Sequence, residues 1–227
     1  MNYDFDWSGI IAALPYMAQG MQTTLLLVAV GMTLGISLGC LLAVARIFGP
    51  RPLAMAVAGY VNFFRAIPLI LTIFWMFFLM PMVLRAITGN PYLSVGAMYA
   101  AVTALVLAES AYYCEIIRAG ISSVRPGQMN AGKAIGMNGF QCVWWIILPQ
   151  AFRNMAPALI NQSIGLLKDT SLVYVISIND FLGAAGQMGL RDGRLVEFYL
   201  FAAAVYLVMC SLGVALVNYL NKRRLAA

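Results

Sequence analysis

The sequence contains no histidine, and only 10% of its 227 residues are charged, against roughly 25% in an ordinary globular domain. Without histidine the chain has no imidazole base, no Ser-His triad and none of the commonest zinc ligand. The GxxxxGK[ST] loop that cradles nucleotide phosphates is also missing, so ATP is not bound here by that route. The four cysteines have no metal-ligand spacing, and we expect reduced thiols. We therefore predict no catalytic residue, no metal site and no cofactor in this chain.

Hydrophobic residues make up 63% of the sequence and occur in long apolar runs. Runs of about 20 residues match a hydrocarbon core about 30 Å thick, so we predict an all-α integral membrane protein. We expect five transmembrane helices, at about residues 20–45, 57–84, 94–117, 154–177 and 197–219. The first is not a signal peptide, because it is too long and follows acidic rather than basic residues. No linker interrupts the sequence, so residues 1–227 are expected to form a single transmembrane domain with its core at 20–219.

The basic residues are unevenly distributed between the two sides of this predicted topology. Nine follow the first and third spans or close the chain, and three lie on the opposite side. The positive-inside rule therefore places the N-terminus outside, and the C-terminus and the 118–153 loop in the cytoplasm. The net charge of +6 then follows from topology, and we do not interpret it as a nucleic-acid-binding surface. The external 178–196 segment is expected to be either a contact for an external protein or an ordinary solvated loop.

Two patterns predict structural contacts. Gly31, Gly35 and Gly39 recur at steps of four in the first span and fall on one face of a helix. Such a face lets a neighbouring helix approach closely, so we predict a packing role. Glu115 and Arg118, at i and i+3 near the end of the third span, are expected to pair as a clasp at the root of the cytoplasmic loop.

The second apolar run is longer than a helix needs to cross a membrane, and it contains Arg65 and Pro68. We expect a helix along the cytoplasmic surface, then a bend, then a span that begins near Arg65. Two interpretations of Arg65 remain open: its side chain extends to the lipid headgroups, or it faces a water-filled pathway.

Four polar residues, Lys168, Asp169, Thr170 and Ser171, follow one another near the middle of the fourth span. Polar groups at that depth are costly in lipid, so they must face protein or water. Lys168 and Asp169 are about 100° apart on a helix and are not expected to pair. Two interpretations remain open: Asp169 forms a buried ion pair with Arg65, or the cluster lines the path of a polar substrate.

The cytoplasmic loop is rich in small residues. Residues 127–135 can form a short helix with little side-chain bulk, and Gly136 and Gly139 are expected to break it. The apolar run 140–148 is expected to end at Pro149. Small residues let the groove of another protein close around a helix. The alternative is an amphipathic loop that rests on lipid.

In this loop Asn130-Ala131-Gly132 is followed by Gly136 and then by Leu148-Pro149. This pattern resembles the cytoplasmic signature of permease subunits of bacterial ABC importers, which has Glu-Ala-Ala, then Gly, and later a Leu-Pro pair. The tripeptide here departs from Glu-Ala-Ala, whereas the later spacing is kept. Four further stretches resemble the polar amino-acid branch, and glutamate/aspartate permeases in particular: residues 5–8, 64–69, 111–120 and 168–172.

The resemblance implies the fold of a type I ABC importer transmembrane domain in the bacterial inner membrane. Its expected partners are a second permease, similar or identical, a cytoplasmic ATPase dimer that binds ATP and Mg, an external binding protein and membrane lipid. The residues expected to couple the ATPase are Gly127, Gln128, Asn130, Ala131, Gly132, Gly136 and Pro149. The residues expected along the path of an acidic amino acid are Arg65, Lys168, Asp169, Thr170 and Ser171.

Several functions stay open at this point. The substrate is expected to be glutamate or aspartate, with another polar amino acid such as glutamine, histidine or arginine as the alternative. A channel or secondary carrier is a second class, but no internal repeat of the kind common in carriers is found. A membrane enzyme would need converging acid, base or metal groups, and only scattered carboxylates are present.

Overall fold

The computed structural model describes residues 4–225, with side chains described as far as Tyr219. These residues form helices and connecting loops, and no strand occurs among them. The helices are α1 (Ser8–Phe48), α2 (Arg51–Ala66), α3 (Leu69–Phe74), the π-helical η1 (Trp75–Leu79), α4 (Met80–Thr88), α5 (Ala97–Ser122), α6 (Pro126–Ala134), α7 (Gly139–Gln141), the π-helical η2 (Cys142–Ile147), α8 (Leu148–Asp169), the 3-10 helix η3 (Thr170–Ile176), α9 (Phe181–Asp192) and α10 (Leu195–Leu225).

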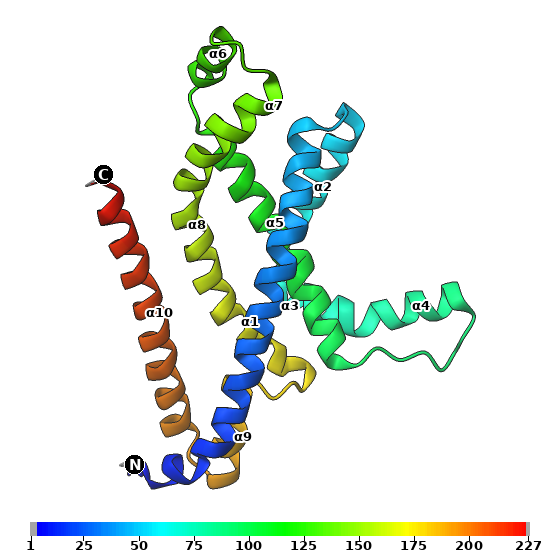
Figure 1. The fold of residues 1–227 in the computed structure, drawn as a ribbon. Helices are drawn as coiled ribbons and strands as arrows, with labels where there is room; N and C mark the ends of the chain where they lie inside the picture. Colours follow the sequence, from blue (N-terminus) through cyan, green and yellow to red (C-terminus); the bar gives the residue numbers. More distant parts are fainter. Residues whose placement is uncertain (1–3, 226–227) are drawn as a thin grey trace.

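The long helices run between two ends of the molecule. Figure 1 shows α1 and α10 starting at the end that carries α9 and running toward the end that carries α6, while α4 projects sideways as an arm. Four described segments are long and apolar enough to cross a membrane: Ser8–Phe48, Leu69–Thr88, Ala97–Ser122 and Leu195–Tyr219. The predicted span at 154–177 is not among these four, because α8 and η3 carry too many polar residues.

The predicted second span is divided into separate helices. α2 ends at Ala66, and Ile67 has an extended backbone with ψ of 137°. A proline disfavours helical geometry in the residue before it, and Pro68 follows here. The predicted bend is therefore present, and the new helix starts just beyond Pro68 rather than at Arg65.

Each π-helical segment precedes a proline by two residues. η1 ends at Leu79 before Pro81, and η2 ends at Ile147 before Pro149. Proline lacks an N–H, and its ring clashes with the carbonyl one turn earlier, a conflict that a wider π turn relieves. The chain therefore stays helical from α7 into α8. The predicted break after the 127–135 helix is present, since α6 ends at Ala134 and the next helix, α7, begins at Gly139. The helix itself continues through Pro149, where the apolar run ends.

The closest helix contact is the seam between α1 and α5, with α8 beside it. A Cβ built on Gly39 would lie 2.7 Å from the Cβ of Tyr113, and one on Gly35 would lie 3.0 Å from the Cβ of Glu109. A Cβ on Gly31 would lie 3.3 Å from a methyl carbon of Leu166 in α8. The neighbouring helix therefore leaves no room for a side chain at Gly39 and very little at Gly35, whereas at Gly31 the Leu166 methyl group would have to shift.

α9 lies in the segment for which the sequence predicted a contact or a solvated loop. Its first turn is capped by the Asp180 side chain, which accepts hydrogen bonds from the N–H groups of Gly183 (2.9 Å) and Leu182 (3.2 Å). A small-residue face then packs between α1 and α10. The buried small residues of α9 are Gly183, Ala184, Ala185, Gly186 and Gly189. Most of this segment is therefore a packed helix.

Candidate functional sites

The polar cluster of the fourth predicted span lies where the α-helix tightens into η3. Thr170 is buried and its hydroxyl donates to the Leu167 carbonyl at 2.8 Å, while the Ser171 hydroxyl donates to the Lys168 carbonyl at 2.6 Å. Both hydroxyls therefore satisfy the backbone near the change of helix type. Lys168 is exposed, and no ion pair joins it to Asp169 in the described part of the chain.

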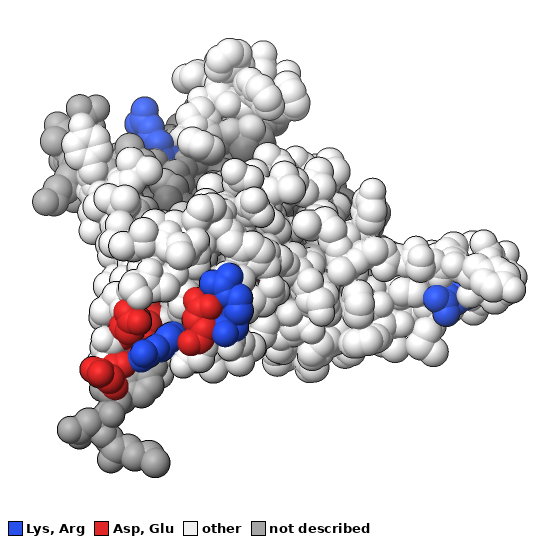
Figure 2. Space-filling view, turned by 90° about the horizontal axis from the view of Figure 1, so that it is seen from below, with Lys and Arg blue, Asp and Glu red and all other residues white. Residues whose placement is uncertain are grey.

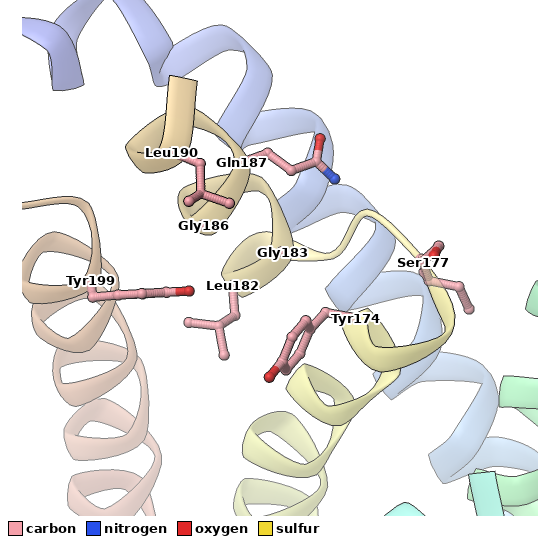
Figure 3. Close-up of a pocket in the computed structure, with 9 residues that line it drawn as sticks. Tyr174, Ser177, Leu182, Gly183, Gly186, Gln187, Leu190 and Tyr199 are labelled. Atoms are coloured by element: carbon pink, nitrogen blue, oxygen red, sulfur yellow. The ribbon is translucent and has the colours of Figure 1, made fainter. Parts of the chain in front are cut away.

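Lys168 and Ser171 line a cavity of ≈ 250 Å³ between η3 and α10, where Tyr199, Tyr206 and Leu182 also lie. A second cavity of ≈ 360 Å³ shares Tyr199 and Leu182. Figure 3 shows this second cavity, with its polar groups supplied by η3, α9 and α10. Its polar lining residues are Tyr174, Ser177, Gln187 and Tyr199. The polar residues that line the two cavities together are one lysine, two serines, three tyrosines and one glutamine.

Arg65 is placed away from Asp169. Its guanidinium carbon lies 5.8 Å from the centre of the Tyr112 ring, a cation–π distance. Among the described residues no ion pair links Arg65 to Asp169, so the predicted buried pair is wrong. Arg65 sits in the last turn of α2, and an aromatic ring of α5 was nearer than the carboxylate.

A buried polar contact links α5 to α8, and the sequence did not predict it. Glu109 is 2% exposed, and both its carboxylate oxygens accept hydrogen bonds from the Gln162 amide, at 3.0 and 3.2 Å. One turn further on, the Tyr113 hydroxyl lies 3.4 Å from the Ser163 hydroxyl. Glu109 and Gln162 are 53 residues apart, so helical periodicity alone carried no sign of their contact. The only available signal was that each is polar within an apolar span.

The clasp at the root of the cytoplasmic loop has three members. Glu115 pairs with Arg118, as the i, i+3 spacing predicted, and it also accepts from Arg46 of α1 at 2.7 Å. The three side chains are 19% to 35% exposed. One carboxylate thus joins α1 and α5 where the loop begins.

α6 ends at Ala134, and a glycine with a left-handed backbone follows two residues later. Gly136 has φ of +85°, and the Met137 N–H donates to the Gly132 carbonyl across the turn. Gly132 is buried, and a Cβ there would lie 2.7 Å from the Cys142 sulfur of η2. The other predicted coupling residues, Gly127, Gln128, Asn130, Ala131, Gly136 and Pro149, are exposed. α6 therefore packs through one face and presents small side chains on the other.

The opposite end of the molecule carries acidic and basic residues together. Figure 2, seen from that end, shows a mixed cluster at one corner and further basic side chains elsewhere, including one toward the tip of the arm. The cluster contains the Arg191–Asp192 pair at 2.7 Å and the Arg194–Glu197 pair at 3.4 Å. The Asp6 N–H also donates to Glu197, at 3.1 Å, which fastens the start of the chain to α10.

Asp180 is fully buried beside this end. Burial raises the pKa of its carboxyl to about 6, although the hydrogen bonds from Gly183 and Leu182 lower it. Thr24 of α1 accepts from the Phe181 N–H at 3.0 Å, so α1 holds the first turn of α9 in place.

Apolar helices long enough to cross a bilayer, cavities between them whose walls include some polar residues, and a loop of exposed small residues are typical of a multi-pass membrane transport protein. The chain belongs to the family of binding-protein-dependent transport system inner membrane components, which matches residues 31–226. It is a permease subunit of an amino-acid ABC importer, located in the inner membrane.

Individual relatives cover almost the whole chain. It is 43% identical over 221 residues to the glutamate/aspartate import permease protein GltK of Escherichia coli O6:H1, across 97% of this chain and 99% of the relative. It is 34% identical to the arginine transport system permease protein ArtQ of Bacillus subtilis, across 92% and 91%. A crystal structure of an amino acid ABC transporter with histidines superposes with a TM-score of 0.87 at 29% identity, covering 97% of this chain and 100% of that one.

Proposed function

We propose that this permease forms the membrane pathway for an acidic amino acid, glutamate or aspartate. The observation that carries the substrate class is the position of Lys168, an exposed cation that lines a cavity together with Ser171, Tyr199 and Tyr206. A substrate carboxylate is a suitable partner for such an ammonium group. The 43% identity to a glutamate/aspartate permease supports the same substrate class.

The proposed pathway lies between η3, α9 and α10. There the Tyr and Ser hydroxyl groups would orient the substrate, while Asp169 and Ser171 would meet its ammonium and carboxylate groups. Arg65, held over Tyr112, is assigned to the helix junction or to the entrance of the pathway. The permease supplies shape and charge, and no bond is made or broken in it.

In this proposal the chain crosses the membrane five times, with α8 and η3 as the fourth crossing. The N-terminus faces outward, and α6 and the C-terminus face the cytoplasm. Two observations support this arrangement: α1 and α10 both run toward the end that carries α6 (Figure 1), and most basic residues of the sequence lie in the loops and the tail assigned to that side. The fourth crossing is tolerated because its polar residues face protein and cavities rather than lipid.

α6 is proposed as the contact for a cytoplasmic ATPase dimer, which binds ATP and Mg. Its exposed face has small side chains at Ala131 and Ala134, and nothing lies within 4 Å of a Cβ built on Gly127 or Gly136. A second permease completes the pathway, and an external binding protein delivers the substrate. Closure of the ATPase dimer would move α6 and, through the clasp at Glu115, α1 and α5.

The substrate class is tested by uptake of labelled glutamate into proteoliposomes that hold the full complex. Lys168→Gln is expected to raise the KM about tenfold, the effect of losing one charge-assisted contact. Arg191→Gln, which removes an exposed cation elsewhere, serves as the matched control. Stronger competition by glutamine, arginine or histidine than by aspartate would overturn the acidic assignment.

The docking role is tested by co-purification of the ATPase. Ala131→Trp places a bulky ring on the exposed face of α6 and is expected to lower ATPase recovery at least about tenfold, because the close contact is lost. Ala12→Trp, at an exposed position of α1, is the control. Full recovery and full transport by Ala131→Trp would contradict a docking role for α6.

A further inference from the structure

An apolar cleft opens where the end of α1 meets the cytoplasmic loop. It has a volume of ≈ 580 Å³, and its walls come from Val44 and Phe48 of α1 and from Met129, Phe140 and Val143 of the loop. The one charged residue lining it is Lys133, in the last turn of α6. A neighbouring cavity of ≈ 240 Å³ shares Phe48, Met129 and Val143 and adds Arg125. The cleft thus combines a deep apolar wall with cations at its edge.

Among the described residues, the cations around this cleft have no acidic partner. No Asp or Glu occurs between residues 7 and 108 or between 116 and 168. Glu115 is therefore the acidic residue nearest this end, and its carboxylate is already shared by Arg46 and Arg118. No described ion pair includes Lys133 or Arg125. An anionic group outside the chain is the natural partner for these cations.

Aromatic side chains flank the same cleft. Phe140 stacks on Trp144, with ring centroids 6.1 Å apart, and Trp144 and Trp145 are 54% and 69% exposed. Exposed tryptophans next to a spanning helix are typical of the headgroup level of a membrane. We therefore expect Phe48, the last residue of α1, to lie at the depth where acyl chains meet headgroups.

We propose that this cleft binds an anionic phospholipid, with an acyl chain along Phe48, Phe140 and Val143 and its phosphate against Lys133. Basic pockets between helices at a membrane surface are suited to anionic headgroups. A free inorganic anion would leave the apolar wall unused, and a peptide segment would bury unpaired backbone groups against it. The positive-inside rule accounts for the excess of cations but not for an apolar cleft among them. The lipid site does not depend on the docking role proposed for α6.

The test uses the full complex in phosphatidylcholine vesicles that contain a small fraction of a photoreactive lipid. The probe is phosphatidylglycerol with a diazirine on one acyl chain, compared with the same label on phosphatidylcholine. After illumination, mass spectrometry locates the adducts. We expect labelling of residues 44–48 and 140–143 to be about fivefold stronger with phosphatidylglycerol, the effect of one cation near an anionic headgroup.

Lys133→Gln is expected to reduce this labelling to the level seen with phosphatidylcholine, while Arg51→Gln, an exposed cation of α2, leaves it unchanged. Val143→Trp, which fills the cleft without touching a charge, is expected to abolish labelling by both lipids. Equal labelling by the two lipids, or adducts spread evenly over exposed residues such as Met55 and Leu207, would overturn the proposal. So would displacement by free oleate but not by unlabelled phosphatidylglycerol, or cross-linking of the cleft to the ATPase.

Discussion

The seam between α1 and α5 and the outer face of α6 are built from the same residue types, but the two regions use them differently. In the seam, a Cβ on Gly39 would meet another helix at 2.7 Å. On α6, nothing lies within 4 Å of a Cβ on Gly127, and Ala131 is exposed. A small residue in the seam makes room for a neighbour inside the chain, whereas on α6 we propose that the room serves a partner outside it. Substitutions in the seam should therefore affect folding, whereas substitutions on the outer face of α6 should affect assembly with a partner.

The largest effect is expected in the seam. Gly39→Leu forces a side chain against the Tyr113 Cβ and the Ser110 carbonyl, which cannot retreat without moving α5. We expect a loss of about 3 kcal/mol of stability, at the upper end for overpacking, with a clear fall in Tm of the purified protein. Gly59→Leu makes the same exchange in α2, where nothing lies within 4 Å, and should leave the Tm unchanged. Equal behaviour of the two variants would show that the seam is not tightly packed.

The buried contact between α5 and α8 should come next. Glu109→Leu leaves the Gln162 amide without its acceptor in the span. We expect this to lower the free energy of unfolding by about 2 kcal/mol. Adding Gln162→Leu removes the orphaned donor, so the double variant should recover part of that loss. A double-mutant cycle of thermal stabilities measures the coupling, and strictly additive losses would rule out a direct interaction.

Asp180 should make stability depend on pH. Because burial raises the pKa of its carboxyl to about 6 in the folded chain, above the usual 3.8, the folded state binds this proton more tightly. The stability that the folded chain gains from binding this proton is fully present below about pH 4 and is lost as the pH rises through about 6. Asp180→Asn keeps an acceptor for the cap and should remove this part of the dependence. A comparison of the Tm at about pH 4.5 and about pH 7.5 checks the sign of this pH dependence. If Asp180→Asn shows the same change in Tm between the two pH values as the original chain, the prediction is contradicted.

The smallest effect is expected at the clasp. Arg46→Gln removes the link from α1 to Glu115 but leaves Arg118 in place, so we expect a loss of about 1 kcal/mol, typical of a partly exposed pair. Transport should fall more than stability does, if the clasp carries motion from α6 to α1. Arg51→Gln, at an exposed position near the same end, is the control. Equal losses of transport in the two variants would remove the clasp from the coupling path.

The sequence predicted what depends on local spacing. The steps of four in α1, the i, i+3 pair of Glu115 and Arg118 and the bend at Pro68 follow from helix geometry and from proline itself. The continuous helix through Pro149 was missed because a π turn accommodates the proline, and a proline alone does not predict such a turn, since Pro15 and Pro157 lie inside α-helices.

Contacts between distant residues were beyond the reach of these patterns. Arg46 and Glu115 are 69 residues apart, and the Glu109 contact spans 53. Only packing of α1, α5 and α8 brings these groups together. α9 was not predicted for a related reason, since its buried glycines and alanines are explained only by packing between α1 and α10. In the structure, Lys168 and Ser171 line the same cavity. Arg65, which the sequence placed on the same path, is not one of its lining residues and lies over Tyr112 instead.

The central claim, that the outer face of α6 is held by a separate ATPase, is tested most directly by a photoreactive amino acid at position 131. In membranes containing the whole complex, illumination should yield a covalent adduct between this chain and the ATPase subunit. The same amino acid at position 12 should yield none. An adduct at 131 with the external binding protein, or the absence of any ATPase adduct in a complex that still hydrolyses ATP and transports, would contradict the account.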